Sequence, residues 1–105
     1  MAHEDLAPKE FLVAYNEQKE NAVLLDVRTA AEIAEGSIED HIAIDIQQPN
    51  FMEKVGTLDK SKTYFVYCRS GNRSGQACKY MATQGFEKLY NLKGGMMAWM
   101  ETDFE

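Results

Sequence analysis

The pattern of apolar and polar positions switches between two periods along the chain. Short apolar runs rich in β-branched and aromatic side chains predict buried strands. Between them, apolar residues recur three and four positions apart, which predicts helices that pack one face on a sheet. The expected strands are Ala22–Asp26, Ile42–Ile46, Thr63–Tyr67 and Lys88–Leu92. The expected helices are Pro8 to about Lys19, Ala30–Glu35, Asn50–Val55, Arg73–Gln84 and Gly95–Glu101.

Residues at the ends of these segments support the helix boundaries. Pro8 suits a first helical turn, and Thr29 with Glu32 three residues later forms a capping-box pattern. Gly36 and Gly85 follow two of the helices, where glycine commonly ends a helix. Strands that alternate with helices predict a three-layer α/β sandwich with a mainly parallel sheet. In the short third helix, the residues expected to face the core are Phe51, Met52 and Val55.

Length and charge narrow the class of protein. The 105 residues predict one domain spanning 1–105. Eleven basic and seventeen acidic residues give a net charge of -6, which disfavours nucleic acid and anionic membranes as partners. The apolar stretches are too short to span a membrane, and the first residues lack the features of a secretory signal, although a signal already removed would leave no trace. Two cysteines are too few for a disulfide framework or a four-cysteine zinc site, so we expect a cytoplasmic protein with reduced thiols.

The strongest chemical signal follows the strand Thr63–Tyr67. Cys68 stands at the carboxyl end of that strand, where open α/β sheets bind ligands. Gly71 permits a tight loop whose N–H groups can converge on an anion, and the next helix adds its positive end. Arg69 and Arg73 add formal charge, so the segment favours a thiolate at Cys68. The alternative is a buried cysteine beside two solvated or paired arginines, and the combination of residues in one loop favours the functional interpretation.

The length of this loop distinguishes two chemistries. Four residues, Arg69 to Asn72, separate Cys68 from Arg73. A cysteine loop that wraps a tetrahedral oxyanion is one residue longer. The shorter loop suits one extra sulfur on the cysteine, and it disfavours a cysteine phosphatase or an arsenate reductase.

Four segments in order resemble the rhodanese family. The loop Cys68-Arg69-Ser70-Gly71-Asn72-Arg73-Ser74 resembles the active-site loop of its single-domain members. The other three segments are Leu24-Leu25-Asp26-Val27-Arg28 with Glu32, Gly36-Ser37-Ile38, and Gly94-Gly95-Met96-Met97-Ala98-Trp99. Ser37 replaces the usual histidine, and Asp40 and His41 replace the usual Gly-Ala.

The resemblance implies a five-stranded, mainly parallel sheet and a sulfur-transfer reaction in two steps. In it, the Cys68 thiolate takes the outer sulfur of thiosulfate or a related donor, holds it as a persulfide, and passes it to a thiol or cyanide. The backbone N–H groups of the loop would hold the persulfide, and the residues concerned are Arg69, Ser70, Gly71, Asn72, Arg73 and Ser74. No metal or organic cofactor is implied. The alternative is a sulfur-relay module that delivers sulfur to an acceptor protein. We expect a monomer or weak dimer.

Several further residues have competing interpretations. By the resemblance, Asp26 and Arg28 support the site, and Asp26 is expected to pair with Arg73. Cys78 is interpreted as a core cysteine in preference to a resolving thiol. The last helix is interpreted as packing on the core in preference to forming a substrate rim, and the residues concerned are Met96, Met97, Trp99 and Met100.

Overall fold

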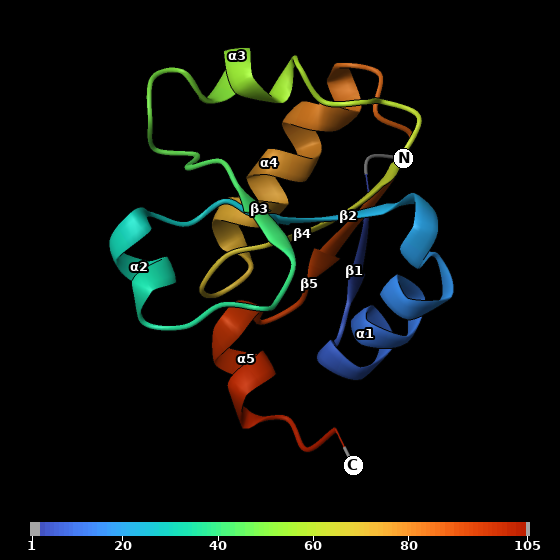
Figure 1. Ribbon diagram of the computed structural model, residues 1–105, viewed down its shortest axis with the longest axis vertical. Coiled ribbons are helices and arrows are strands. Elements are labelled where there is room, and N and C mark those ends of the chain that lie inside the picture. The colour runs from blue at the N-terminus through green and yellow to red at the C-terminus, as the bar shows by residue number, and fades with distance from the viewer. Residues whose placement is uncertain (1–2, 105) are drawn as a thin grey trace.

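A single sheet of five parallel strands organises the protein (Figure 1). The computed structural model describes residues 3–104. The strands are β1 (Glu4–Leu6), β2 (Ala22–Asp26), β3 (His41–Ala43), β4 (Thr63–Tyr67) and β5 (Lys88–Leu92), in the spatial order β1-β5-β4-β2-β3. The helices are α1 (Pro8–Glu17), α2 (Ala30–Ala34), α3 (Phe51–Val55), α4 (Asn72–Thr83) and α5 (Gly95–Glu101), with a short 3-10 turn at Lys19–Asn21.

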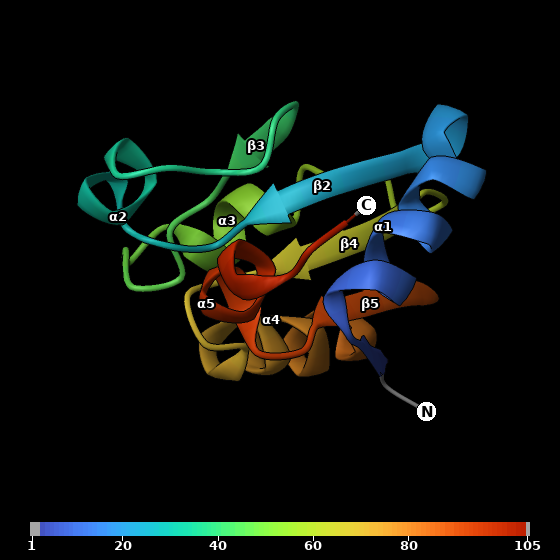
Figure 2. The same cartoon turned by 90° about the horizontal axis from the view of Figure 1, so that it is seen from below.

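The central strand β4 is buried on both of its faces, which explains its continuous apolar sequence. Tyr64 and Val66 face one core, together with residues of α3 and α4 such as Val55 and Met81. Phe65 and Tyr67 belong to the opposite core, which contains Phe11 of α1 and Met96 of α5. Figure 2 shows these two groups of helices around the strands. The predicted three-layer α/β sandwich is therefore confirmed.

Local signals at the helix ends are also confirmed. Pro8 occupies the first position of α1. The Thr29 side chain accepts from the Glu32 N–H while Glu32 accepts from the Thr29 N–H, so both halves of the capping box are present at α2. Among residues 3–104, no helix is both long and apolar enough to cross a membrane.

Three details of the fold differ from what the sequence predicted. Strand β1 was not predicted, because Glu4 and Asp5 are exposed and three residues carry no readable alternation. Strand β3 ends at Ala43, earlier than the predicted Ile46, although the Ile46 N–H still donates to the Val27 carbonyl. Met52 of α3 is 62% exposed and does not face the core as predicted, because so short a helix buries only Phe51 and Val55.

Candidate active site

The loop between β4 and α4 lies at the carboxyl edge of the sheet. Cys68 immediately follows β4, and Gly71 caps α4 with a φ of 97°. This left-handed conformation favours glycine, and an added Cβ would also lie 3.1 Å from the Leu92 carbonyl oxygen. The backbone therefore turns sharply enough to direct the first N–H groups of the helix back toward Cys68.

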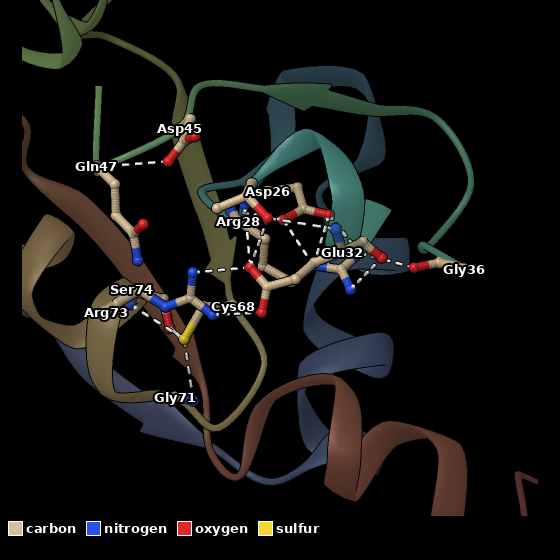
Figure 3. A network of polar contacts seen from close by, with 11 residues as sticks. Asp26, Arg28, Glu32, Gly36, Asp45, Gln47, Cys68, Gly71, Arg73 and Ser74 are labelled. Atoms are coloured by element: carbon tan, nitrogen blue, oxygen red, sulfur yellow. Dashed lines mark hydrogen bonds and ion pairs between the residues drawn. The ribbon is translucent and has the colours of Figure 1, made fainter. Parts of the chain in front are cut away.

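Two backbone N–H groups and the Ser74 hydroxyl surround the Cys68 sulfur (Figure 3). The Gly71 N–H lies 3.1 Å from Sγ, and the Ser74 N–H and the Ser74 hydroxyl each lie 3.3 Å from it. Cys68 itself is 0% exposed. Burial raises the pKa of the Cys68 thiol, but hydrogen bonds from the Ser74 hydroxyl and from the loop N–H groups outweigh burial and leave that pKa below its ordinary value. The arrangement stabilises negative charge on this sulfur.

Helix α5 holds the loop from the other side. The Met96 N–H donates to the Cys68 carbonyl at 2.9 Å, and the Met97 N–H donates to the Arg69 carbonyl at 3.0 Å. Gly95 makes this close approach feasible, because a Cβ there would lie 2.3 Å from the Arg69 carbonyl oxygen. The first turn of α5 thus obtains acceptors for its N–H groups, and the loop is fixed in place.

Arg73 is paired with Glu32 of α2, and the expected pair between Arg73 and Asp26 was wrong. The two outer nitrogens of Arg73 donate to the two carboxylate oxygens of Glu32, each at 2.8 Å. The hydrogen bond from Arg73 lowers the pKa of Glu32 to about 2. Much of the positive charge of Arg73 is therefore neutralised within the protein.

Asp26 pairs with Arg28, two residues along the chain. The Arg28 Nη2 lies 2.7 Å from Asp26 Oδ2, and Asp26 is 0% exposed. Arg28 also donates to the carbonyls of Glu32 and Gly36 at 3.3 and 2.8 Å. Arg28 thereby fixes the end of α2, and α2 in turn presents Glu32 to Arg73. The Asp26–Arg28 pair therefore supports the site through α2. Neither residue forms a hydrogen bond with the Cys68 sulfur in the described part of the chain.

A pocket of about 170 Å³ opens beside the loop. Arg69 lines it and is exposed, and among residues 3–104 no carboxylate forms an ion pair with it. Met97 and Met100 line the same pocket and are 49% and 71% exposed, whereas Met96 is buried. The expected packing of the last helix on the core therefore holds for Met96 and Trp99 and fails for Met97 and Met100, because the short α5 turns only one face to the sheet.

The remaining loop residues and the second cysteine take different positions. Ser70 and Asn72 are exposed, and the Ser70 N–H contributes to the lowered pKa of Cys68. Cys78 of α4 is 0% exposed within the core, as expected. Burial raises the pKa of the Cys78 thiol to about 12, so this thiol stays protonated near neutral pH.

Two polar residues near the site were not predicted from the sequence. Asn91 of β5 is buried and contacts Ser74, and Asp5 of β1 contacts Asn91. A polar residue within an otherwise buried strand was the available signal for Asn91. Asp5 had no signal, because its strand was itself not recognised.

Comparison with known proteins agrees with this geometry. The family model described as "Rhodanese-like domain" matches residues 8–102. The chain is 49% identical over 83 residues to the putative sulfurtransferase YtwF of Bacillus subtilis, covering 79% of this chain and 78% of that protein. It is 34% identical over 95 residues to the thiosulfate sulfurtransferase GlpE of Pseudomonas savastanoi pv. phaseolicola, covering 90% and 86%.

Solved structures agree with the fold. The rhodanese-related protein from Thermoplasma volcanium superposes with a TM-score of 0.79 at 28% identity, covering 98% of this chain and 96% of that one. The resemblance inferred from the four sequence segments is confirmed. This chain belongs to the family of rhodanese-like domains.

Proposed function

We propose that the protein is a sulfurtransferase that moves a sulfane sulfur from thiosulfate or a related donor to a thiol or cyanide through a persulfide on Cys68. The observation that carries this proposal is the convergence of the Gly71 N–H, the Ser74 N–H and the Ser74 hydroxyl on one buried sulfur. The two backbone N–H groups are fixed donors, and such donors stabilise the attacking thiolate and the negative sulfur that follows it.

The reaction divides into two balanced displacements. In the first, the Cys68 thiolate attacks the outer sulfur of thiosulfate, a new S–S bond forms, and the old S–S bond breaks with its electron pair leaving on sulfite. In the second, an acceptor thiolate or cyanide attacks the outer sulfur of the persulfide, and the electron pair returns to Cys68. Each step transfers the sulfane sulfur from one nucleophile to another, so no external oxidant is required.

Names among the relatives support the reaction class. YtwF is named a putative sulfurtransferase and GlpE a thiosulfate sulfurtransferase.

Because Cys68 is fully buried, a donor reaches its sulfur only when the loop side chains move aside. We place the approach of the donor at the pocket lined by Arg69 and Met97, which lies beside the loop. Arg69 would hold the anionic part of the donor there.

Delivery to a protein acceptor is a second candidate. Met97 and Met100 are exposed beside Arg69, and flexible thioether side chains adapt well to the surface of a partner protein. A relay of this kind predicts that a cysteine on a partner protein accepts sulfur faster than cyanide does. An enzyme for small substrates predicts the reverse order.

Intact-mass measurement tests the proposal. After incubation with thiosulfate or with glutathione persulfide, the protein should gain the mass of one sulfur atom, and cyanide should remove it. Cys68→Ser should abolish the gain, whereas Cys78→Ser, which removes the other thiol, should retain it. Absence of the gain with both donors would refute the proposed function.

A further inference from the structure

The hydroxyl group of Ser74 has two neighbours and only one proton to give. Its Oγ lies 3.3 Å from the Cys68 sulfur and 2.5 Å from Oδ1 of Asn91. An amide oxygen accepts hydrogen bonds and cannot donate them. The contact between the two oxygens therefore requires Ser74 to donate to Asn91, and Ser74 then has only lone pairs to offer to the sulfur.

The orientation of the Asn91 amide is fixed by its other contacts. Its Nδ2 donates to Oδ1 of Asp5 at 3.0 Å and to the Gly71 carbonyl at 3.1 Å. If the amide were reversed, its oxygen would face these two acceptors and its nitrogen would face Ser74. Asn91 is only 5% exposed, so water could not compensate the lost bonds. The amide oxygen is consequently held toward Ser74.

We propose that Asn91 is a positioning residue for the Cys68 nucleophile, acting by competing with the sulfur for the single proton of the Ser74 hydroxyl. This inference rests on the proposed role of Cys68 as the nucleophile. When Cys68 is a thiol, Ser74 donates to Asn91 and accepts from the S–H group. When the sulfur is a thiolate or a persulfide anion, the Ser74 hydroxyl rotates and donates to it. The switch is a rotation about the Cβ–Oγ bond, and no covalent bond changes except the ionisation of the thiol.

Removal of the Asn91 amide should favour the ionised sulfur. Without the competing acceptor, the Ser74 hydroxyl is free to donate to sulfur at all times. The Gly71 carbonyl keeps a partner, because the Gly75 N–H also donates to it at 3.0 Å. The turn that supplies the Gly71 N–H should therefore survive the substitution. A residue with a purely structural role would produce the opposite change, since a loosened loop loses donors to the thiolate.

Other charged and titratable groups surround this contact from the neighbouring elements. They are Arg69 of the loop, Arg73, Cys78 and Lys79 of α4, Glu32 of α2, the Asp26–Arg28 pair at the end of β2, Asp45 after β3, and Asp5 with His3 at β1. None of these groups hydrogen-bonds to the Ser74 hydroxyl within residues 3–104. Asn91 should therefore influence the ionisation of Cys68 by way of its hydrogen bond with the Ser74 hydroxyl.

A double-mutant cycle tests the inference. The thiol pKa of Cys68 is measured from the pH dependence of iodoacetamide alkylation in a Cys78→Ser background. Asn91→Val should lower the pKa by the equivalent of about twofold to tenfold in the ionisation constant, the range of one neutral hydrogen bond. Ser74→Ala should raise the pKa, and in that background Asn91→Val should have no further effect. The inference would be overturned if Asn91→Val raised the thiol pKa of Cys68. It would also be overturned if Asn91→Val shifted that pKa equally in the wild type and in Ser74→Ala.

Controls separate this effect from loss of stability. Leu92→Ala removes a buried side chain of the same strand from the opposite core and should lower the melting temperature without moving the pKa of Cys68. If Asn91 variants do not fold, the protein with Asn91 intact provides the readout. The side-chain carbonyl resonance of Asn91 should then titrate with the Cys68 midpoint, and this titration should vanish in Ser74→Ala. The inference would be overturned if the chemical shift of this carbonyl did not change at the pH at which Cys68 ionises.

Measurement of sulfur loading by intact mass distinguishes failure of the proposed function from failure of the proposed role of Asn91. If the cycle gives the expected shifts and no donor loads sulfur on Cys68, the proposed function fails and the role of Asn91 stands. If sulfur loads normally and Asn91→Val leaves the pKa unchanged, the role of Asn91 fails and the proposed function stands.

Discussion

The outer nitrogens of Arg73 and the two carboxylate oxygens of Glu32 meet in a parallel pair, each N···O distance being 2.8 Å. This fork joins α4 to α2 and neutralises the cation that stands one residue before Ser74. Arg69 is then the cation beside the loop that has no ion-pair partner in the described chain. The balance of charge at the site is thus set by Glu32 as much as by the two arginines.

Replacement of Glu32 by glutamine should increase the positive potential at Cys68. Glutamine can still accept at the Thr29 N–H, so the capping of α2 should persist. We expect the thiol pKa of Cys68 to fall by about half a unit, a threefold change in the ionisation constant, and the KM for thiosulfate to fall. Glu35→Gln, which removes an exposed carboxylate lining the same pocket, serves as the control. A change of equal size in both variants would show that only net charge matters.

The same ion pair predicts a loss of stability in acid. The pKa of Glu32 is lowered in the folded protein from 4.5 to about 2. A carboxyl group with a lowered folded pKa stabilises the protein above its unfolded pKa, and that stabilisation disappears as the pH falls toward the folded value. Urea unfolding of the wild type should therefore show a free energy of unfolding that declines between about pH 4.5 and pH 2. The decline should be smaller in Glu32→Gln, and parallel curves for the two proteins would contradict the assignment.

Gly95→Ala should displace the Cys68 loop and reduce sulfur loading. Its Cβ would lie 2.3 Å from the Arg69 carbonyl oxygen and 2.6 Å from the Ser70 nitrogen, so the loop must move away from α5. We expect a loss of sulfur loading of about tenfold or more, as displacement of a catalytic group commonly produces. Gly85→Ala is the matched control, since Gly85 has a comparable positive φ and its Cβ position meets only Lys60 at 3.6 Å. That variant should lose about 1 kcal/mol of stability and load sulfur normally.

Arg28→Ala should unfold the protein more easily, and in the molecules that remain folded it should affect the chemistry only through the position of Glu32. It leaves the carboxylate of Asp26 buried and unpaired, at a cost of about 3–5 kcal/mol. The double variant Asp26→Leu with Arg28→Met removes both charges and should recover part of that loss. Chemical denaturation measures the stability, and sulfur loading per folded molecule measures the chemistry. If loading per folded molecule fell below that of the wild type, Arg28 would have a direct role in the reaction.

Arg69→Ala should discriminate between donors. Its guanidinium lines the pocket beside the loop and would bind the sulfonate end of thiosulfate. We expect kcat/KM for thiosulfate to fall about tenfold or more, the effect of one charge-assisted hydrogen bond, and to fall less for glutathione persulfide. Lys93→Ala, which removes an exposed charge after β5, is the control. Equal losses with both donors would contradict the role of Arg69 in binding the donor anion.

Much of the fold follows from local patterns in the sequence. The continuous apolar run at Thr63–Tyr67 identified the central strand, because such a strand is buried on both faces. The Thr29–Glu32 box located the start of α2, because capping depends only on neighbouring residues. Edge strand β1 escaped prediction, since its side chains are mostly exposed and it pairs only with β5.

Contacts between side chains of different elements were harder to anticipate. Asp26 and Glu32 were both near enough along the chain to reach the site, and it is Glu32 of α2 that Arg73 binds. Arg28 binds the carbonyls of Glu32 and Gly36 and so helps to hold α2 in that position. No spacing in the sequence encodes this arrangement. The backbone donors to Cys68 were predictable, because they come from the loop and the first turn of α4.

The bonds from the Met96 and Met97 N–H groups to the loop carbonyls have a consequence for local opening of the fold. These two amides can exchange with solvent deuterium only when the contact between α5 and the Cys68 loop is broken. The loop and the first turn of α5 should therefore exchange as one cooperative unit, with a common opening free energy. Hydrogen exchange in this unit would then report the integrity of the site, independently of any substrate.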